Sequence, residues 1–364
     1  MELKNRTKEV QKREKLERRV EKFPKKESIP SVGNEPLLLS IESSCDDTAV
    51  AITGIETLHL YFHKRQSQAT LHSPYGGVVP ELASRLHLEA FPKLIEECRP
   101  YFSQLGGIGV TNRPGLAITL QEGVMVAKAL ALALNLPLIE INHLIGHIYS
   151  LFIERPAITP MLVLLVSGGH TQLLWFEGVE KVCQISTTLD DSLGEAFDKT
   201  AKLLGFGYPG GPIIEKLARK RGRDLGLPIP LKNNSTLNFS FSGLKNAVRL
   251  AVMKKKGGVT DIAYSFQKSA ITHILQKTER AIQKWHPPHL GIVGGVSANL
   301  EIRRAFLELA TKYKFTLHYP KLEFCSDNGA MIGRAGVELF KLNRFTPPDQ
   351  LEVKARTPFP PCSP

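Results

Sequence analysis

The chain has 364 residues, of which 42% are hydrophobic and 23% charged, so it is long enough to bury a substantial core in two domains or lobes. Its longest apolar stretch, around residues 124–136, is interrupted by Lys128 and Asn135 and falls short of the roughly 20 residues of a membrane span, so we expect no membrane association. The formal net charge of +12 at pH 7 indicates a polyanionic partner, because clustered lysines and arginines gain affinity for phosphates by releasing counterions.

The five cysteines are scattered along the chain. They are odd in number and have no CxxC spacing: Cys45, Cys98, Cys183, Cys325 and Cys362. This pattern argues against both a disulfide framework and a structural zinc site. We therefore expect a reducing, cytoplasmic location.

Residues 1–36 form a basic arm in which Lys and Arg alternate with Glu. The arm has few large apolar residues, no hydrophobic region of a signal peptide and too many Glu for an organellar transit peptide. We expect a solvated or transiently helical segment. It is either a dispensable tail or an auxiliary RNA-binding arm.

The folded part is expected to begin at Leu37 with a meander of three strands. Apolar and alternating runs predict strands at 37–41, 48–52 and 58–63, and a turn rich in Ser and Asp joins the first two. A Gly-rich loop then enters a helix that carries Arg85 and His87. A short strand at 108–111 and an Ala-rich helix at 122–134 follow.

Two histidines, His143 and His147, come just after the apolar run 136–141. On a helix their i, i+4 spacing places both imidazoles on one face, where they can offer two ligands to one divalent metal, although chance alone also produces such pairs. Gly146 between them costs a helix roughly 1 kcal/mol relative to alanine. We therefore expect a close approach of another segment at this glycine.

The opening pattern then returns. Strands are predicted at 161–166, 172–175 and 181–185, again with a small polar turn between the first two. The repeat predicts two related lobes that face one another across a cleft suited to a nucleotide phosphate. We expect a first lobe at 37–150, a second at 151–345 with a last helix able to pack back on the first, and an irregular Pro-rich tail at 346–364.

The second half is predicted to be mostly helical. A helix with acidic residues at its start begins at Asp190, a rigid loop at 208–212 opens the next, and residues 261–285 form a long amphipathic helix. Strands are expected at 290–293 and 316–319, the first running into Gly294-Gly295 and a helix from Leu300. Residues 324–330 are expected to start the last helix.

Neither GxGxxG nor the P-loop pattern GxxxxGK[ST] occurs in a position to bind a nucleotide. The turn Ser167-Gly168-Gly169-His170-Thr171 presents backbone N–H groups to an anion or is a plain hairpin turn. Two imidazoles and one carboxylate suit Fe(II) or Zn(II) with positions left open for a substrate oxygen. Asp327 is the candidate third ligand, and an ordinary helix N-cap is its alternative role.

Eight motifs occur together and in order between Leu37 and Leu342. They are IESSCDDT (41–48), YGGVVPELASR (75–85), HLIGH (143–147), SGGHT (167–171), GEAFDK (194–199), YPGGP (208–212), FSFSGLK (239–245) and SDN (326–328). The set closely resembles the TsaD family, the tRNA threonylcarbamoyladenosine transferases of bacteria, whose members were formerly labelled glycoproteases.

The resemblance implies an α/β fold with two lobes, of the actin-like and Hsp70-like ATPase superfamily, with duplicated ribonuclease-H-like lobes and an interlobe cleft. It also implies transfer of a threonylcarbamoyl group from threonylcarbamoyl-AMP to the N6 amine of adenosine 37 of tRNA, 3′ of the anticodon, in tRNAs that read codons starting with adenine. The implied cofactor is one divalent metal per subunit, usually Fe²⁺, with Zn²⁺ as the alternative. The implied partners are tRNA, a paralogous subunit of the same fold and a small ATPase.

Carried over motif by motif, the resemblance implies three groups of site residues. The metal ligands would be His143, His147 and Asp327, and the catalytic acidic residue would be Asp46, beside Asp47 where the family more often has Glu. The substrate would be held by Ser167, Gly168, Gly169, His170, Thr171, Asp198, Gly211 and Asn299. The chain departs from the family pattern at Arg113, where Gly is usual, and at Glu122, where Val is usual.

Three other functions remain to be weighed. A metallopeptidase is disfavoured because zincins carry Glu directly after the first histidine of HExxH, whereas position 144 is Leu. A non-catalytic scaffold of the same fold would have no need for Asp46, the paired histidines and Asp327 together. A small-molecule kinase of the superfamily would not usually carry the paired histidines.

Overall fold

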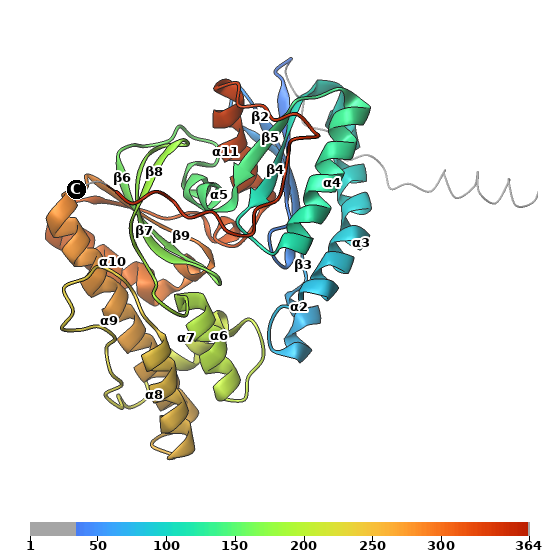
Figure 1. Cartoon of the computed structure of the whole chain (residues 1–364). Coiled ribbons are helices and arrows are strands. Elements are labelled where there is room, and N and C mark those ends of the chain that lie inside the picture. Colours follow the sequence, from blue (N-terminus) through green and yellow to red (C-terminus); the bar gives the residue numbers. More distant parts are fainter. Residues whose placement is uncertain (1–33, 363–364) are drawn as a thin grey trace, which may run out of the picture. The chain divides into compact units, whose positions relative to one another are not determined.

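Two five-stranded sheets organise residues 34–362, the part of the chain that the computed structural model describes (Figure 1). In each sheet one strand, β2 or β7, runs antiparallel to the other four. Both sheets belong to one compact unit that begins at Glu35. The basic arm predicted for residues 1–36 lies outside the described residues as far as residue 33, as do the last two residues of the predicted tail.

The two sheets have the same strand order. The first sheet has the order β3-β2-β1-β4-β5 and the second the order β8-β7-β6-β9-β10. Each strand of the first sheet therefore has a counterpart at the same position in the second. The strands of the first are β1 (Leu37–Glu42), β2 (Asp47–Gly54), β3 (Leu60–Ser67), β4 (Leu105–Arg113) and β5 (Leu138–Asn142); those of the second are β6 (Met161–Val166), β7 (Thr171–Gly178), β8 (Lys181–Thr187), β9 (His289–Val293) and β10 (Thr316–His318). The predicted duplication is confirmed. The central strands β1 and β6 are buried along their whole length, as their apolar runs require.

Helices surround both sheets. In chain order they are α2 (Ala69–His72), α3 (Pro80–Cys98), α4 (Ala117–Leu134), α5 (His143–Tyr149), α6 (Leu193–Leu203), α7 (Gly210–Ala218), α8 (Ser242–Met253), α9 (Val259–Trp285), α10 (Leu300–Tyr313) and α11 (Gly329–Lys341). Short 3₁₀ turns are η1 (Ser73–Tyr75), η2 (Arg99–Gln104), η3 (Ser150–Phe152), η4 (Gly295–Ala298) and η5 (Leu322–Phe324). The helices α6 to α10 all fall between β8 and β10, which makes the second half the more helical, as predicted.

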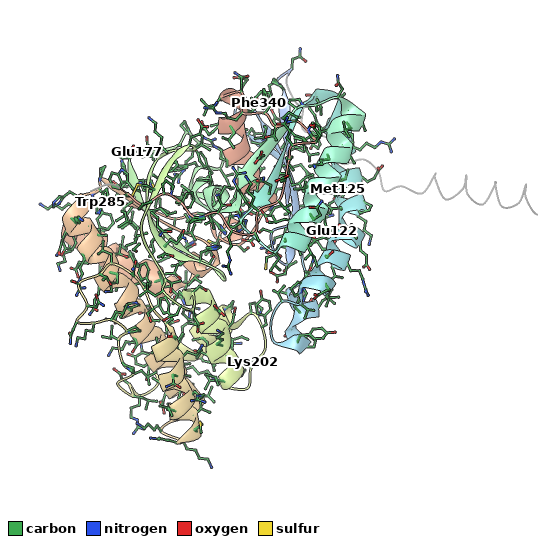
Figure 2. The ribbon with its side chains drawn as sticks, viewed as in Figure 1. Glu122, Met125, Glu177, Lys202, Trp285 and Phe340 are labelled. Carbon is green, nitrogen blue, oxygen red and sulfur yellow. A yellow bond between two sulfur atoms is a disulfide. The ribbon has the colours of Figure 1, made fainter. Side chains whose placement is uncertain are left out.

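Helix α11 packs back against the first sheet. It packs against β1 and β2, and Ser40 donates a hydrogen bond of 2.8 Å to the carbonyl oxygen of Gly329. A side chain at Gly329 would meet the backbone of Val50 at 2.5 Å, so only glycine allows this approach. Farther along the helix, Phe340 lies over Gly107 of β4 (Figure 2). The residues just before α11 are therefore held beside the first sheet.

Helix α6 begins later than predicted. Ser192 caps it by accepting a hydrogen bond from the N–H of Glu195, and the helix starts at Leu193 instead of Asp190. The Asp190 carboxylate accepts hydrogen bonds from Ser240, Phe241 and Ser242, at the start of α8. The prediction was wrong because this aspartate caps a different helix, which also gives the FSFSGLK motif a structural role.

Helix α4 contains both the longest apolar stretch and one of the departures from the family pattern. By length and composition it could cross a membrane, but core helices pass the same test, and α4 packs against β4 and α3. Glu122 on this helix accepts a hydrogen bond of 2.7 Å from Ser84 of α3 (Figure 2). The second departure, Arg113, forms an ion pair with Glu140 at 2.5 Å. Both unusual residues thus make contacts within the chain.

The C-terminal tail crosses from the first sheet to the second. The N–H of Thr346 donates a hydrogen bond to the carbonyl of Leu138 in β5. The N–H of Lys354 donates one to the carbonyl of Asn112 near the end of β4. At its far end, the N–H of Cys362 binds the carbonyl of Gln184, and Cys362 forms a disulfide with Cys183 of β8. The expectation of no disulfide was therefore wrong for this pair. The sequence spacing does not show that the tail returns along β8.

Candidate active site

The two histidines lie on the short helix α5, directly after β5. The side chain of Asn142 caps this helix by accepting hydrogen bonds from the N–H groups of Leu144 and Ile145. Both imidazoles are buried, and their ring centroids are 4.6 Å apart. The predicted helix and the shared face are confirmed.

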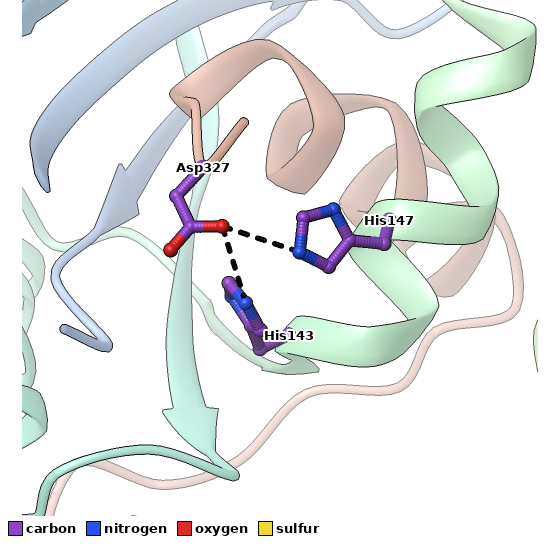
Figure 3. A group of neighbouring side chains, drawn as sticks. All are labelled: His143, His147 and Asp327. Atoms are coloured by element: carbon purple, nitrogen blue, oxygen red, sulfur yellow. Dashed lines mark ion pairs between the residues drawn. The ribbon is translucent and has the colours of Figure 1, made fainter. Parts of the chain in front are cut away.

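Asp327 meets both histidines, although it lies far from them in the sequence. Its Oδ1 atom is 3.5 Å from Nε2 of His143 and 3.2 Å from Nε2 of His147 (Figure 3). The three possible ligand atoms all lie within 4.8 Å of one another. The neighbouring Asn328, and not Asp327, caps helix α11, so the alternative role of Asp327 as N-cap does not apply.

Gly146 explains how α11 comes so close. A side chain at this position would meet the Cδ1 atom of Ile332 on α11 at 2.6 Å. The glycine therefore allows α5 and α11 to pack tightly, and the tight packing places Asp327 beside the histidines. The close approach predicted at Gly146 is confirmed.

The residues present fit a divalent metal. Neither ring nitrogen of His147 has a hydrogen-bond partner among the described residues, although both are buried, and the short distance from Nε2 to Asp327 lacks hydrogen-bond geometry. A buried polar atom without a partner costs about 1–3 kcal/mol, so a ligand for Nε2 is expected. Two imidazoles and a carboxylate that converge form a donor set suited to Fe(II) or Zn(II).

Ionic interactions polarise this group strongly. Burial alone would lower the pKa of His143, but the charges of Glu42 and Asp327 outweigh it and raise that pKa to about 9. Burial would raise the pKa of Asp327, whereas His143 and His147 hold it below its ordinary value. Burial keeps the pKa of His147 low. A metal that binds here must therefore displace a proton from His143.

Glu42, at the end of β1, is a residue that sequence reasoning missed. It is fully buried, and its Oε2 atom lies 3.1 Å from Nδ1 of His143. Thr111 donates to the same oxygen at 2.6 Å, and the N–H of Ser44 donates to Oε1 at 2.6 Å. With Nδ1–H directed at this carboxylate, His143 presents Nε2 toward Asp327. Its place in the IESSCDDT motif was the available signal.

Replacing Glu42 with glutamine should weaken metal binding by about 10- to 100-fold, because a neutral amide no longer fixes the ring orientation and tautomer of His143. Metal affinity should be measured by competition with a chelator, and the melting temperature of the metal-free proteins should be compared. The exposed Glu89→Gln is the matched control. An unchanged metal affinity for Glu42→Gln would show that Glu42 does not orient the ligand.

Asp46 lies in the turn between β1 and β2, close to the second lobe. Its Oδ2 atom accepts a hydrogen bond of 3.2 Å from the hydroxyl of Tyr208, which belongs to the YPGGP loop before α7. Burial and then the negative charge of Asp327 raise the pKa of Asp46. Its neighbour Asp47 has a pKa raised to about 7 by burial and by Asp327, and faces Arg65 at 3.5 Å.

The turn of residues 167–171 joins β6 to β7 and is braced by the start of α6. The hydroxyl of Ser192 donates to the carbonyl of Gly168 at 2.5 Å, and a side chain at Gly194 would meet the carbonyl oxygen of Ser167 at 2.4 Å. Gly168 and Gly169 instead face open space, and their N–H groups have no hydrogen-bond partner among residues 34–362. This arrangement suits an anion.

The same turn lies within electrostatic reach of the histidines. Burial, together with the charges of His143 and His147, lowers the pKa of His170 to about 4. Within the turn, the N–H of Ser167 binds the carbonyl of His170, and Thr171 Oγ1 accepts a hydrogen bond from the N–H of Leu193. Helix α5, which carries both histidines, packs against β6, the strand that leads into this turn.

The remaining predicted substrate contacts lie on helices of the second lobe. Asp198 of α6 accepts a hydrogen bond of 2.6 Å from the N–H of Gly210, and burial raises its pKa to about 6. Gly211, in the first turn of α7, faces open space. Asn299 caps α10 through its oxygen and donates to Gln267, which leaves one N–H of its amide for a ligand.

Comparison with known proteins gives a consistent picture. The family model described as TsaD, tRNA N6-adenosine threonylcarbamoyltransferase, matches residues 59–334. A protein of that name from Nautilia profundicola is 56% identical over 326 residues, which cover 90% of this chain and 100% of the relative. Its namesake from Helicobacter pylori strain 26695 is 51% identical over 334 residues, covering 88% and 98%.

Two solved structures share the fold at low sequence identity. HypF from T. kodakarensis has a TM-score of 0.58 and 16% identity, over 87% of this chain and 49% of its own. Component A of the (R)-2-hydroxyglutaryl-CoA dehydratase from Acidaminococcus fermentans has a TM-score of 0.52 and 12% identity, over 84% and 97%. These likenesses agree with the duplicated sheets and confirm the predicted actin-like ATPase fold. By its family match and by its identity to relatives along nearly their whole length, the chain belongs to the TsaD family.

Proposed function

We propose that this chain transfers the threonylcarbamoyl group of threonylcarbamoyl-AMP to the N6 amine of the adenosine 3′ of the anticodon, in tRNAs that read codons starting with adenine. The observation that carries the proposal is the convergence of the ligand atoms of His143, His147 and Asp327, all within 4.8 Å of one another. The high identity to relatives with this name supports it.

The metal in this proposal is one Fe²⁺ per subunit, with Zn²⁺ as the alternative, held by His143, His147 and Asp327. When bound, it supplies Lewis-acid polarisation of a carbonyl oxygen. The protein's own part is to hold the two imidazoles on one rigid helix turn and to direct Nδ1–H of His143 at Glu42. The ligand geometry is therefore set before substrate arrives.

The adenylate would rest against the second lobe. The N–H groups of Gly168 and Gly169 have no hydrogen-bond partner among residues 34–362 and would donate to the phosphate of the leaving AMP. Ser167, His170 and Thr171 maintain the turn, and the open position of Gly211 and the remaining N–H of Asn299 would contact the nucleotide. Asp198 would accept a hydrogen bond from a substrate hydroxyl or amine.

Asp46 would act as the general base. The adenine amine is a weak nucleophile because its lone pair is delocalised into the ring, so loss of its proton must accompany formation of the bond between N6 and the carbamoyl carbon. Burial and the charge of Asp327 raise the pKa of Asp46, which makes its carboxylate a stronger proton acceptor. Tyr208 donates to this carboxylate and would hold it toward the amine.

The macromolecular partners belong to the proposal as well. The tRNA would present its adenosine as a base turned out of the anticodon loop, which is how proteins usually read single-stranded RNA. A paralogous subunit of the same fold and a small ATPase would complete the system, and the cytoplasm, where tRNA is found, would be its location. The absence of Glu after His143 speaks against a peptidase, since the HExxH base is missing.

The direct test is nucleoside mass spectrometry of tRNA incubated with the metal-loaded protein, the partner proteins and threonylcarbamoyl-AMP. We expect threonylcarbamoyladenosine in tRNAs that read codons starting with adenine, and none when the adenylate is omitted or the metal is removed with a chelator. A tRNA in which guanosine replaces the target adenosine is the matched control. No modified adenosine under metal-replete conditions would refute the proposed function.

A further inference from the structure

The positive charge of the chain is concentrated in one segment of the second lobe. Residues 210–260 contain eleven lysines and arginines but only two acidic residues, whereas the basic arm at 1–36 carries eleven basic and seven acidic residues. The segment includes two dense runs, Arg219-Lys220-Arg221-Gly222-Arg223 and Lys254-Lys255-Lys256. Neither run has a part in the candidate active site.

The fold brings these two runs together. The first follows the end of α7 and the second follows the end of α8, and the guanidinium of Arg223 donates a hydrogen bond of 2.9 Å to the carbonyl of Lys256. A side chain at Gly222 would meet the backbone of Asp261, in the first turn of α9, at 2.7 Å, and one at Gly257, next to Lys256, would meet Leu225 at 3.1 Å, so the segments are closely packed. The ends of α7 and α8 that carry them can be followed in Figure 1. We name the resulting cluster the basic surface: Lys220, Arg221, Arg223, Lys254, Lys255 and Lys256.

The charges of the basic surface are exposed and uncompensated. All six side chains are exposed, and none forms an ion pair with a carboxylate in the described part of the chain. The nearby acidic groups are occupied elsewhere: Glu215 pairs with Arg219, Asp224 pairs with Lys268, and Asp261 accepts backbone hydrogen bonds. Clustered like charges without counterions repel one another, so a polyanion would stabilise the cluster.

Helix α7 links this surface to the candidate active site. Its first residue, Gly210, donates to Asp198, one of the predicted substrate contacts, and its last, Ala218, directly precedes the first basic run. Nine helical residues span about 12 Å from the first to the last, so the surface begins within a few nucleotides of Asp198. We infer that the basic surface binds the phosphate backbone of the tRNA whose adenosine reacts at the candidate active site, an inference that rests on the proposed function.

Binding of tRNA to the basic surface can be tested by replacing its lysines with glutamine. Lys220→Gln, Lys254→Gln and Lys256→Gln should be combined, since these three side chains make no hydrogen bonds with residues 34–362, whereas Arg221 and Lys255 have positive φ. Exposed lysines remote from the cluster give a matched control with the same charge change: Lys181→Gln, Lys284→Gln and Lys341→Gln. tRNA affinity of the full-length, metal-loaded chain is measured as a function of salt.

The cluster variant should lose about tenfold or more in tRNA affinity near physiological salt, and its slope of log K against log salt should fall by about 2–3, because three phosphate contacts are removed. The control should match the wild type. Equal affinities and slopes for the two variants would overturn the inference. Intact tRNA binding with loss of binding to vesicles of phosphatidylserine and phosphatidylcholine would overturn it in favour of a membrane surface.

The proposed function and the basic surface fail in different ways. If the wild type binds tRNA through the cluster but forms no threonylcarbamoyladenosine, the proposed function fails and the surface stands. If the product forms at the same rate and with the same tRNA affinity in both variants, the surface fails and the function stands. Product formation is followed by nucleoside mass spectrometry in the same reactions.

Discussion

Replacing Asp327 with asparagine should abolish tight metal binding and reduce threonylcarbamoyl transfer by at least about a hundredfold, since loss of Lewis-acid assistance amounts to several kcal/mol. Asparagine keeps the volume of the side chain, so packing between α5 and α11 should be retained. The reason for the loss is electrostatic: the carboxylate is the only anionic atom group within the three-residue donor set. Metal content after dialysis and the single-turnover rate are the measurements.

Two comparisons separate this effect from simple unfolding. His147→Ala removes a neutral ligand from the same group, and it should also lose metal, whereas His59→Ala, at a half-exposed histidine on the surface, should keep it. The melting temperature of each metal-free variant shows whether the fold survives. A folded Asp327→Asn protein with normal metal content and rate would remove these residues from the metal site.

Replacing Asp46 with asparagine should reduce the rate of transfer by about 100- to 10,000-fold while leaving adenylate binding largely intact, because general base catalysis has this magnitude. The amide oxygen of asparagine can still accept the hydrogen bond from Tyr208, so the loop geometry should persist. Single-turnover rates and the dissociation constant of threonylcarbamoyl-AMP distinguish the two effects. Asp47→Asn, which alters the neighbouring carboxylate, is the matched comparison.

The pH dependence of the transfer rate is an independent test of Asp46 as the general base. A base must be ionised, so the wild-type rate should fall as acid protonates Asp46, and the fall should begin at a higher pH than for an ordinary aspartate because burial raises its pKa. Asp46→Asn should lack this limb of the profile. Normal turnover in that variant would exclude Asp46 as the base.

Local patterns sufficed to predict most of the fold. Apolar and alternating runs mark strands such as Leu37–Glu42 and Met161–Val166, and their repetition predicts the duplicated sheets. The paired histidines follow the helical period on α5. These features depend on neighbours in the sequence, and such features can be read from a single chain.

Features that depend on distant segments required the structure. The spacing of residues does not reveal that α11 returns to the first sheet, so Asp327 remained one of two alternatives until its distance to His147 was known. Asp190 was assigned to the wrong helix because its partners lie fifty residues farther along the chain. Glu42 was missed because the sequence shows neither that its carboxylate is buried nor that His143 lies beside it.

The C-terminal tail limits how far the two sheets can move apart. It is bonded to Leu138 and Asn112 near one sheet and to Gln184 at the edge of the other, and the bond between Cys183 and Cys362 makes the last attachment covalent. Any motion that separates the two sheets along this path must either extend the tail or break its hydrogen bonds to one of the sheets. The tail thus acts as a tether of fixed length, whose covalent end is released by reduction.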